Sequence, residues 1–303
     1  MPPPRLLCLA LIGLGAPALL AQTPAAQPPA PAKITALYHV GYWVRDIEKS
    51  RAFYEAYLGF AEPYVLNTPA GALQMVVIKV NDGQSIYLFP NPSKILPNGD
   101  NLDHLGLVTD NSAGLHDQLE ARGVKPSAVK KAHVGDMIFG IRDPDGRPFE
   151  VTQFEPDGQV MKHKGQDLPK TRIAMRLESA VVSVSNLDAS LAFYRDQLGF
   201  KVTWRGSMLD GKFDQVELSV PDGTSGVVLR PYATRPGAAA PRAVPEFWLE
   251  VLDVSSAAAI LADRATAGGF PPPSPVSALL SGGHQATVVD PDGTLVVLTD
   301  QWH

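Results

Sequence analysis

Residues 142–151 have the sequence RDPDGRPFEV, a tight turn that leads into a strand. Proline presets φ, glycine adopts positive φ, and the aspartates can accept hydrogen bonds from nearby backbone, so the pattern predicts a turn at residues 143–146. Glu150 lies inside the strand that follows, where an unpaired buried carboxylate is costly, so it must face solvent or a cation. The sequence DPDGTLVVL at residues 290–298 repeats the turn, with the apolar Val297 in place of the glutamate.

The turn belongs to a longer repeat. Residues 53–54 (FY) recur at residues 193–194, and residues 58–60 (LGF) recur at residues 198–200, all at one constant offset. Self-similarity at a fixed offset indicates a duplicated structural module. A chain of 303 residues has room for about two domains of ordinary size, which agrees with two copies.

The hydrophobic periodicity of the first copy predicts the order strand, helix, strand, strand, strand, twice in succession. The first unit comprises a strand at 38–44, a helix at 50–58 and strands at 62–67, 73–80 and 85–89. The second comprises a strand at 103–108, a helix at 112–122 and strands at 125–131, 137–141 and 149–154. Asp46 is the predicted cap of the first helix, and Gly59 and Gly123 are the residues predicted to end the two helices. The predicted fold class is therefore α+β.

Residues 1–21 have the features of an export signal. A single charge at Arg5 precedes an apolar run at residues 6–14, and small residues lead to a suitable cleavage site after Ala21. We expect an exported protein, periplasmic or extracellular, with no stable membrane span once the signal is cleaved. Cys8 is the only cysteine and lies in this segment, so the mature chain has no thiol for a disulfide or a thiolate metal site.

Composition divides the rest of the chain. Residues 22–33 are rich in proline and alanine and form a predicted linker, followed by a module at residues 34–156. A polar linker is predicted at residues 157–171 and a second module at residues 172–303. The net charge of −5, without a cluster of lysine and arginine, argues against a nucleic-acid partner. We expect a small-molecule substrate, and either a monomer or a homodimer.

The paired βαβββ units, the FYxxxLGF helix end and the DPDG turn before a final strand resemble the vicinal oxygen chelate superfamily. This group includes glyoxalase I, bleomycin-resistance proteins, fosfomycin-resistance transferases and extradiol dioxygenases. The resemblance covers residues 34–302 as two modules. It implies that each pair of units forms one half-open, curved mixed sheet, with a divalent metal on the concave face.

By this resemblance the metal ligands are His39, His104 and Glu150, and Tyr87 stands at a vacant fourth position. Two histidines and one carboxylate leave positions open on a metal such as Fe(II), with Mn(II), Zn(II) or Ni(II) as alternatives. We therefore expect one divalent ion in the first module. The corresponding residues of the second module are Ser179, Val227, Phe247 and Val297, so that module is expected to be degenerate and to hold no metal.

Strand periodicity supports the same three ligands, because side chains two residues apart share a face. Each ligand then shares its face with a small residue: the pairs are His39 and Gly41, His104 and Gly106, and Glu150 and Thr152. We predict that these three small residues line the substrate pocket.

The ligand set is compatible with more than one reaction. We favour a non-haem, dioxygenase-like enzyme that binds its substrate through two adjacent oxygens, with His133 and Tyr87 as catalytic candidates for proton transfer or substrate binding. The extradiol dioxygenase pattern around the last strand is present except at Lys131 and Gly140. A glyoxalase-type metal-dependent isomerase or lyase is an alternative, although that group usually has a fourth ligand where Tyr87 stands. A third interpretation is a non-catalytic, resistance-type protein that binds a small molecule.

Overall fold

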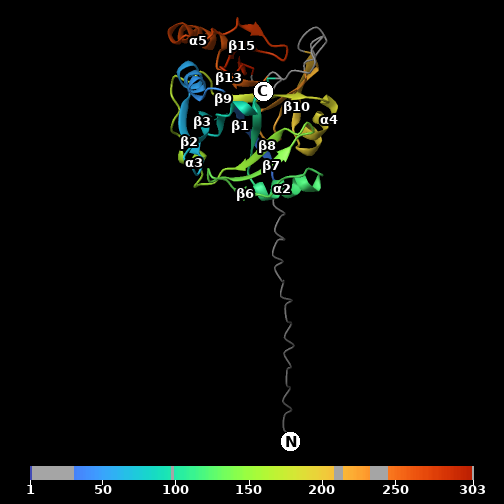
Figure 1. Cartoon of the computed structure of the whole chain (residues 1–303). Coiled ribbons are helices and arrows are strands. Elements are labelled where there is room, and N and C mark those ends of the chain that lie inside the picture. The colour runs from blue at the N-terminus through green and yellow to red at the C-terminus, as the bar shows by residue number, and fades with distance from the viewer. Residues whose placement is uncertain (2–30, 97–98, 208–213, 233–244, 302–303) are drawn as a thin grey trace. The chain divides into compact units, whose positions relative to one another are not determined.

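The computed structural model describes residues 31–96, 99–207, 214–232 and 245–301 (Figure 1). The predicted export signal at residues 1–21 and the predicted linker at residues 22–33 lie outside the described residues, apart from Met1 and residues 31–33. No helix in the described part of the chain has both the length and the hydropathy needed to cross a bilayer.

The first module contains eight strands and several short helices. Its strands are β1 (Ile34–Trp43), β2 (Ala61–Asn67), β3 (Leu73–Asn81), β4 (Gln84–Phe89), β5 (Leu102–Thr109), β6 (Lys130–Lys131), β7 (Met137–Arg142) and β8 (Pro148–Gln153). Its helices are α1 (Ile47–Arg51), the π-helix η1 (Ala52–Tyr57), the 3-10 helix η2 (Pro92–Lys94) and α2 (Ser112–Ala121), and α3 (Gln159–Lys162) follows the last strand.

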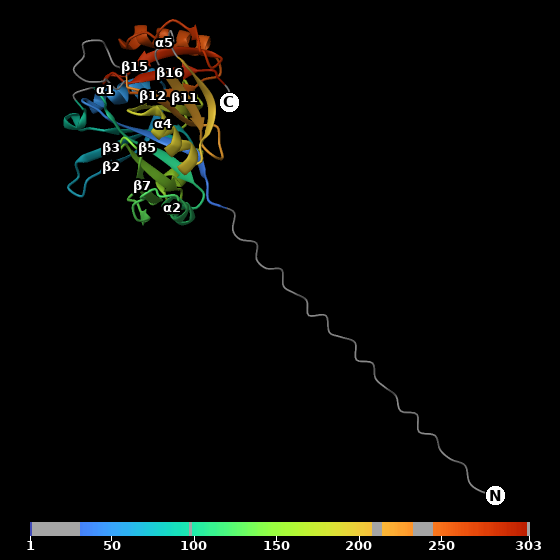
Figure 2. The same cartoon turned by 90° about the vertical axis from the view of Figure 1, so that its right-hand side faces the viewer.

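The second module repeats this plan. Its strands are β9 (Arg176–Val184), β10 (Lys201–Ser207), β11 (Asp214–Ser219), β12 (Gly226–Pro231), β13 (Glu246–Glu250), β14 (Ser277–Ala278), β15 (His284–Val289) and β16 (Leu295–Thr299). Its helices are α4 (Leu187–Leu191), the π-helix η3 (Ala192–Gln197) and α5 (Val254–Gly268). In both views of the molecule α2 and α5 lie at opposite ends (Figures 1 and 2).

Each module is one eight-stranded mixed sheet. The strand order is β2-β3-β4-β1-β5-β8-β7-β6 in the first and β10-β11-β12-β9-β13-β16-β15-β14 in the second. The first strands of the two units, β1 and β5, pair antiparallel at the centre of the sheet, and each pairs in parallel with the last strand of its own unit. The predicted α+β fold of tandem modules with half-open mixed sheets is confirmed.

The first helix differs from its prediction. Asp46 caps it as expected, by accepting a hydrogen bond from the amide of Lys49, but after Arg51 the helix widens into a π-helix. The amide of Leu58 bonds the carbonyl of Phe53, five residues back, at 3.0 Å. Aromatic spacing alone does not distinguish the two helix types, because a π turn inserts only one residue into a helical pattern. The helix ends at Gly59 with φ of +78°.

The two modules pack on each other through the repeated turn. The hydroxyl of Tyr54 in the first module donates to Asp290 of the second at 3.1 Å, and Tyr194 of the second donates to Asp143 of the first at 3.2 Å. The other oxygen of Asp143 accepts from the backbone of its own turn, as predicted. One hydrophobic cluster contains residues of both modules. The aspartate that opens each DPDG turn therefore also joins the modules.

Candidate metal centre

Two histidines meet at the centre of the first sheet. His39 lies on β1 and His104 on the neighbouring β5, and their Nε2 atoms are 2.8 Å apart. In the antiparallel register His39 is opposite Gly106, and Gly41 is opposite His104. Each ring therefore extends over a glycine of the adjacent strand. A Cβ added at Gly106 would lie 2.3 Å from the His39 ring, and one added at Gly41 would lie 3.1 Å from the His104 ring.

Glu150 completes the group from β8. It pairs with Gly106 on one side and with Gly140 on the other, so both flanking strands present no side chain beside it. The candidate ligand atoms of His39, His104 and Glu150 all lie within 4.8 Å of one another. The hydroxyl of Thr152 donates to Glu150 Oε1 at 3.2 Å, which orients the carboxylate.

The chemistry of these donors fits a divalent ion. His39 is fully buried, and its Nδ1 has no hydrogen-bond partner within the described residues. Burial, and then the neighbouring His104, hold the pKa of His39 well below its usual value, which keeps the ring neutral and able to coordinate. The two Nε2 atoms are 2.8 Å apart, so both histidines would be able to hold the same ion.

Asp103 is part of the site although the sequence analysis did not identify it. Its carboxylate is 2.6 Å from Nδ1 of His104, which directs the Nε2 lone pair toward His39 and Glu150. Strict alternation along a strand would place Asp103 on the opposite face from His104. The register between β1 and β5 shifts between Gly41 and Tyr42, opposite this position, and such a bulge re-aims a side chain. An acidic residue beside a ligand histidine was the available signal.

Tyr87 lies against the site from β4. Its ring stacks on His39, with centroids 4.0 Å apart, and its hydroxyl is 2.6 Å from the hydroxyl of Tyr38. Burial raises the pKa of both tyrosines well above the usual value, so both remain protonated. Tyr87 therefore fixes the His39 ring, and one of its hydrogen bonds is already formed with Tyr38.

A cavity of about 280 Å³ opens beside two of the three candidate ligands. His104 and Glu150 line it, with Tyr87 and the exposed His133, which lies on the turn after β6. The apolar part of the wall consists of Leu66, Met75, Phe89, Ala132 and Val134. A second hollow, of about 270 Å³, is also lined by His104 and Glu150 and includes Lys130 and Phe139.

Two of the three small residues predicted to line the substrate pocket, Gly41 and Gly106, lie against the ligand rings of the neighbouring strand. Gly41, Gly106 and Thr152 are absent from the linings of the two hollows beside the ligands. The space beside the two glycines is filled by the imidazoles of His104 and His39. The nearest neighbours of a strand residue are those directly across from it on the adjacent strand, so each glycine makes room for the histidine opposite it.

The equivalent site in the second module is filled. Its register pairs Ser179 with Trp248 and Trp248 with Val297, so Trp248 stands where the first module has Gly106. The indole packs in a buried cluster with Val228 and Val297 and donates to Glu246 at 2.7 Å. Arg230 forms an ion pair with the same carboxylate.

This register corrects two of the predicted equivalences. Glu246, and not Phe247, corresponds to His104, and Val228, and not Val227, corresponds to Tyr87. A shift of one residue along a strand moves a side chain to the other face. The turn before β12 has one residue more than the turn before β4, because Lys79 pairs with Ser85 in the first module whereas Ser219 pairs with Gly226 in the second. The positions of Ser179 and Val297 agree with the prediction.

Known proteins share this architecture. A sequence profile of the Glyoxalase/Bleomycin resistance protein/Dioxygenase superfamily matches residues 36–151 and 176–298. The uncharacterised protein YwbC of Bacillus subtilis (strain 168) is 29% identical over 119 residues, which are 38% of this chain and 94% of that protein.

Two solved structures illustrate the shared fold. The Mn(II)-bound glyoxalase from Novosphingobium aromaticivorans superposes with a TM-score of 0.66 at 21% identity, over 88% of this chain and 82% of that one. The 2,2',3-trihydroxybiphenyl 1,2-dioxygenase from Sphingomonas wittichii strain RW1 superposes with a TM-score of 0.63 at 17% identity, over 88% of this chain and 90% of that one. From the profile matches to both modules, the chain belongs to the Glyoxalase/Bleomycin resistance protein/Dioxygenase superfamily.

Proposed function

We propose that the chain is a metal-dependent, dioxygenase-like enzyme that binds a small substrate through two adjacent oxygen atoms. The observation that carries this proposal is the group of His39, His104 and Glu150 on one face of the first sheet, beside a cavity of about 280 Å³. A divalent ion held by these three residues, Fe(II) by preference or Mn(II), Zn(II) or Ni(II), would supply open positions for substrate and stabilise negative charge on its oxygens.

The residues around the ligands have separate roles in this proposal. Asp103 orients His104, and the stacked ring of Tyr87 holds His39, so neither ligand needs to reorganise when substrate enters. The apolar wall of Leu66, Met75 and Phe89 excludes water from the body of the substrate. His133 is the exposed base at the same cavity and accepts or returns a substrate proton.

The glyoxalase-type alternative has one observation in its favour. A solved structure of similar fold is a Mn(II)-bound glyoxalase, so the fold also carries a named glyoxalase. Against it, a glyoxalase of this type would need a carboxylate or amide ligand at the fourth position. That position holds Tyr87, whose hydroxyl lies 2.6 Å from the hydroxyl of Tyr38. The dioxygenase-like assignment therefore remains the proposal.

Metal content and oxygen uptake test the proposal together. Protein purified anaerobically without chelators should contain about one equivalent of iron or manganese, and the His104→Ala variant should lose it. Oxygen consumption with a catechol, absent in the variant, would support dioxygenase-like chemistry. Zinc or nickel at the same stoichiometry, with turnover of a substrate that consumes no oxygen, would favour the isomerase or lyase. Absence of metal after reloading would leave a small-molecule binding protein.

Export is part of the same proposal. The charge at Arg5 and the apolar run at residues 6–14 support a cleaved signal, and an exported enzyme would work in the periplasm or outside the cell. Mass spectrometry of the protein recovered from the periplasm and the medium should give an N-terminus at Gln22. A cytoplasmic protein that begins at Met1 would contradict the proposal.

A further inference from the structure

Two contacts between an arginine of one module and the end of a π-helix in the other module are built alike, but only one of them includes a pair of aromatic rings. At the first, Arg264 donates to the carbonyl of Tyr57 at 2.8 Å, and at the second, Arg122 donates to the carbonyl of Gln197 at 2.8 Å. Tyr57 and Gln197 are the last residues of the matching π-helices η1 and η3. The two contacts are therefore equivalent places in the repeated fold.

The side chains at the two contacts differ. At the first, the ring of Phe270, just after α5, stacks on Tyr57 with centroids 4.8 Å apart and an interplanar angle of 14°. At the second, Val124 follows Gly123, the positive-φ glycine after α2, as Phe270 follows Gly269 after α5, and the partner position is Gln197. A pair of stacked aromatic rings is thus replaced by two smaller side chains that carry no ring.

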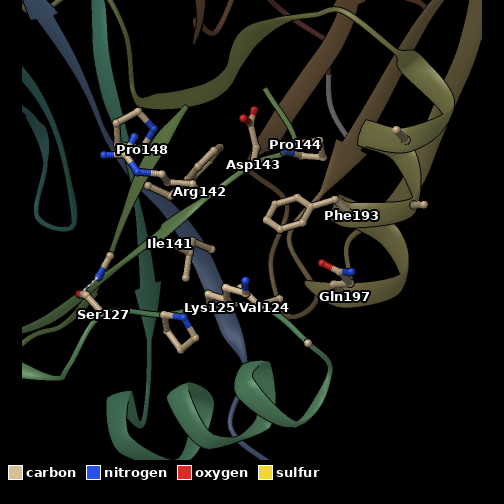
Figure 3. Close-up of a pocket in the computed structure, with 16 residues that line it drawn as sticks. Val124, Lys125, Ser127, Ile141, Arg142, Asp143, Pro144, Pro148, Phe193 and Gln197 are labelled. Carbon is tan, nitrogen blue, oxygen red and sulfur yellow. Dashed lines mark hydrogen bonds between the residues drawn. The ribbon is translucent and has the colours of Figure 1, made fainter. Parts of the chain in front are cut away.

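A groove of about 730 Å³ lies where the second ring pair would be, and we call it the junction groove. Figure 3 shows Phe193 and Gln197 of the second module facing Val124, Lys125 and Ile141 of the first. The volume is within the range of small-molecule pockets. Ile141 and Phe193 belong to its lining and are otherwise buried, so the floor is apolar.

The rim of the junction groove is positively charged. Lys125 and Arg142 are both exposed there. Lys125 has no ion-pair partner in the part of the chain that the structure describes, whereas one guanidinium nitrogen of Arg142 already donates to the carbonyl of Gly146 at 2.7 Å. The only carboxylate in the lining is Asp143, whose oxygens already accept from Tyr194 and from the backbone of Asp145 and Arg147. The groove therefore presents positively charged side chains to a ligand, while its one carboxylate is already hydrogen-bonded.

We propose that the junction groove is a second ligand site, which takes a flat aromatic carboxylate. The aromatic ring takes the place that Phe270 and Tyr57 fill at the other contact, and the carboxylate meets Lys125 and Arg142. The site lies on the side of β8 that carries Phe149, whereas the adjacent Glu150 faces the candidate metal centre. The groove shares Ser127, Gly140, Pro148 and Phe149 with the second hollow beside His104 and Glu150, but none of the three candidate metal ligands belongs to its own lining.

Titration of the purified full-length chain with 2-naphthoate, followed by calorimetry, tests the site. We expect saturable binding with a Kd tighter than about 1 mM, the order expected for a ligand of this size. The neutral isostere 2-naphthamide should bind at least about tenfold more weakly, because it lacks the charge. The His104→Ala variant should bind 2-naphthoate with unchanged affinity, since it alters only the metal centre.

Two variants locate the site. Val124→Phe with Gln197→Tyr recreates the ring pair of the other contact, and should abolish binding while the protein still unfolds cooperatively. Lys125→Glu with Arg142→Glu changes two exposed residues and should weaken binding by at least about tenfold. No saturable binding to the parent chain, undiminished binding in the charge variant, or loss of binding in His104→Ala would each overturn the proposal. If the ring-pair variant fails to fold, the proposal is tested by the charge variant and by the comparison of 2-naphthoate with 2-naphthamide.

Discussion

The imidazole of His39 occupies the space in which a side chain of Gly106 would lie. A Cβ on Gly106 would be 2.3 Å from the ring, well inside van der Waals contact, whereas the matching distance at Gly41 to the His104 ring is 3.1 Å. A side chain at either position would therefore collide with the histidine of the neighbouring strand, and the collision would be more severe at Gly106 than at Gly41.

Gly106→Ala should displace the His39 ring and weaken metal binding by about tenfold to a hundredfold. Gly41→Ala should have a smaller effect, because the neighbouring ring needs to move by only a few tenths of an ångström. Gly83→Ala, whose Cβ meets nothing closer than 4.0 Å, is the control. Competition with a fluorescent chelator gives the affinities, and equal affinity in all three variants would contradict the role of the glycines.

Asp103→Asn should keep the size of the side chain while it removes the charge beside His104 Nδ1. Since a carboxylate partner fixes the tautomer and raises the basicity of a ligand histidine, metal affinity should fall by about tenfold or more. Asp167→Asn is the matched control, because the carboxylate of Asp167 lies 2.7 Å from Nδ1 of His163 and both residues are outside the candidate ligand groups. An unchanged affinity in Asp103→Asn would mean that this pair has no influence on coordination.

His133→Ala should lower kcat by about a hundredfold or more if His133 is the proton-transferring group, with metal content unchanged. The side chain is exposed at the cavity and lies outside the three-ligand group, so neither the fold nor the coordination depends on it. Steady-state kinetics and metal analysis on the same sample separate these effects. Full activity in the variant would show that His133 has no role in proton transfer.

Asp290 makes stability depend on pH. Burial raises its pKa to about 6, well above its value in an unfolded chain, so the folded state binds its proton more tightly. The stability that protonated Asp290 contributes is fully present below the pKa that its carboxyl has in the unfolded chain. It is lost as the pH rises from there through about 6. Asp290→Asn should remove that dependence, worth on the order of 3 kcal/mol.

Denaturant unfolding of the parent and Asp290→Asn at about pH 4.5 and about pH 7.5 measures this effect. The stability of the variant relative to the parent should improve toward the higher pH. A difference that stays constant with pH would show that Asp290 titrates alike in the folded and unfolded chain.

Trp248→Ala should destabilise the second module without any change at the metal centre. Trp248 is 2% exposed and stands at the position that Gly106 has in the first module, so its removal should cost about 3–5 kcal/mol. Metal stoichiometry should stay at one per chain. A second equivalent of metal in the parent protein, lost in this variant, would contradict a filled site.

Local sequence patterns were sufficient for much of this protein. The DPDG turns, the repeat of FY and LGF, and the alternation along the strands predicted the tandem α+β fold, because turn and strand preferences are local properties. His39, His104 and Glu150 were predicted as ligands by a family resemblance that strand alternation supported, and the structure brings their ligand atoms within 4.8 Å.

What only the tertiary structure decided depends on contacts between strands and between modules. The bulge that brings Asp103 to His104, and the register that puts Glu246 and Trp248 on the concave face of the second sheet, follow from pairing between distant strands. Each such pairing shifts a whole strand at once, so a difference of one residue changes which side chains face a site, and no local preference reports it. For the same reason, the junction groove could be found only once the two modules were seen packed together.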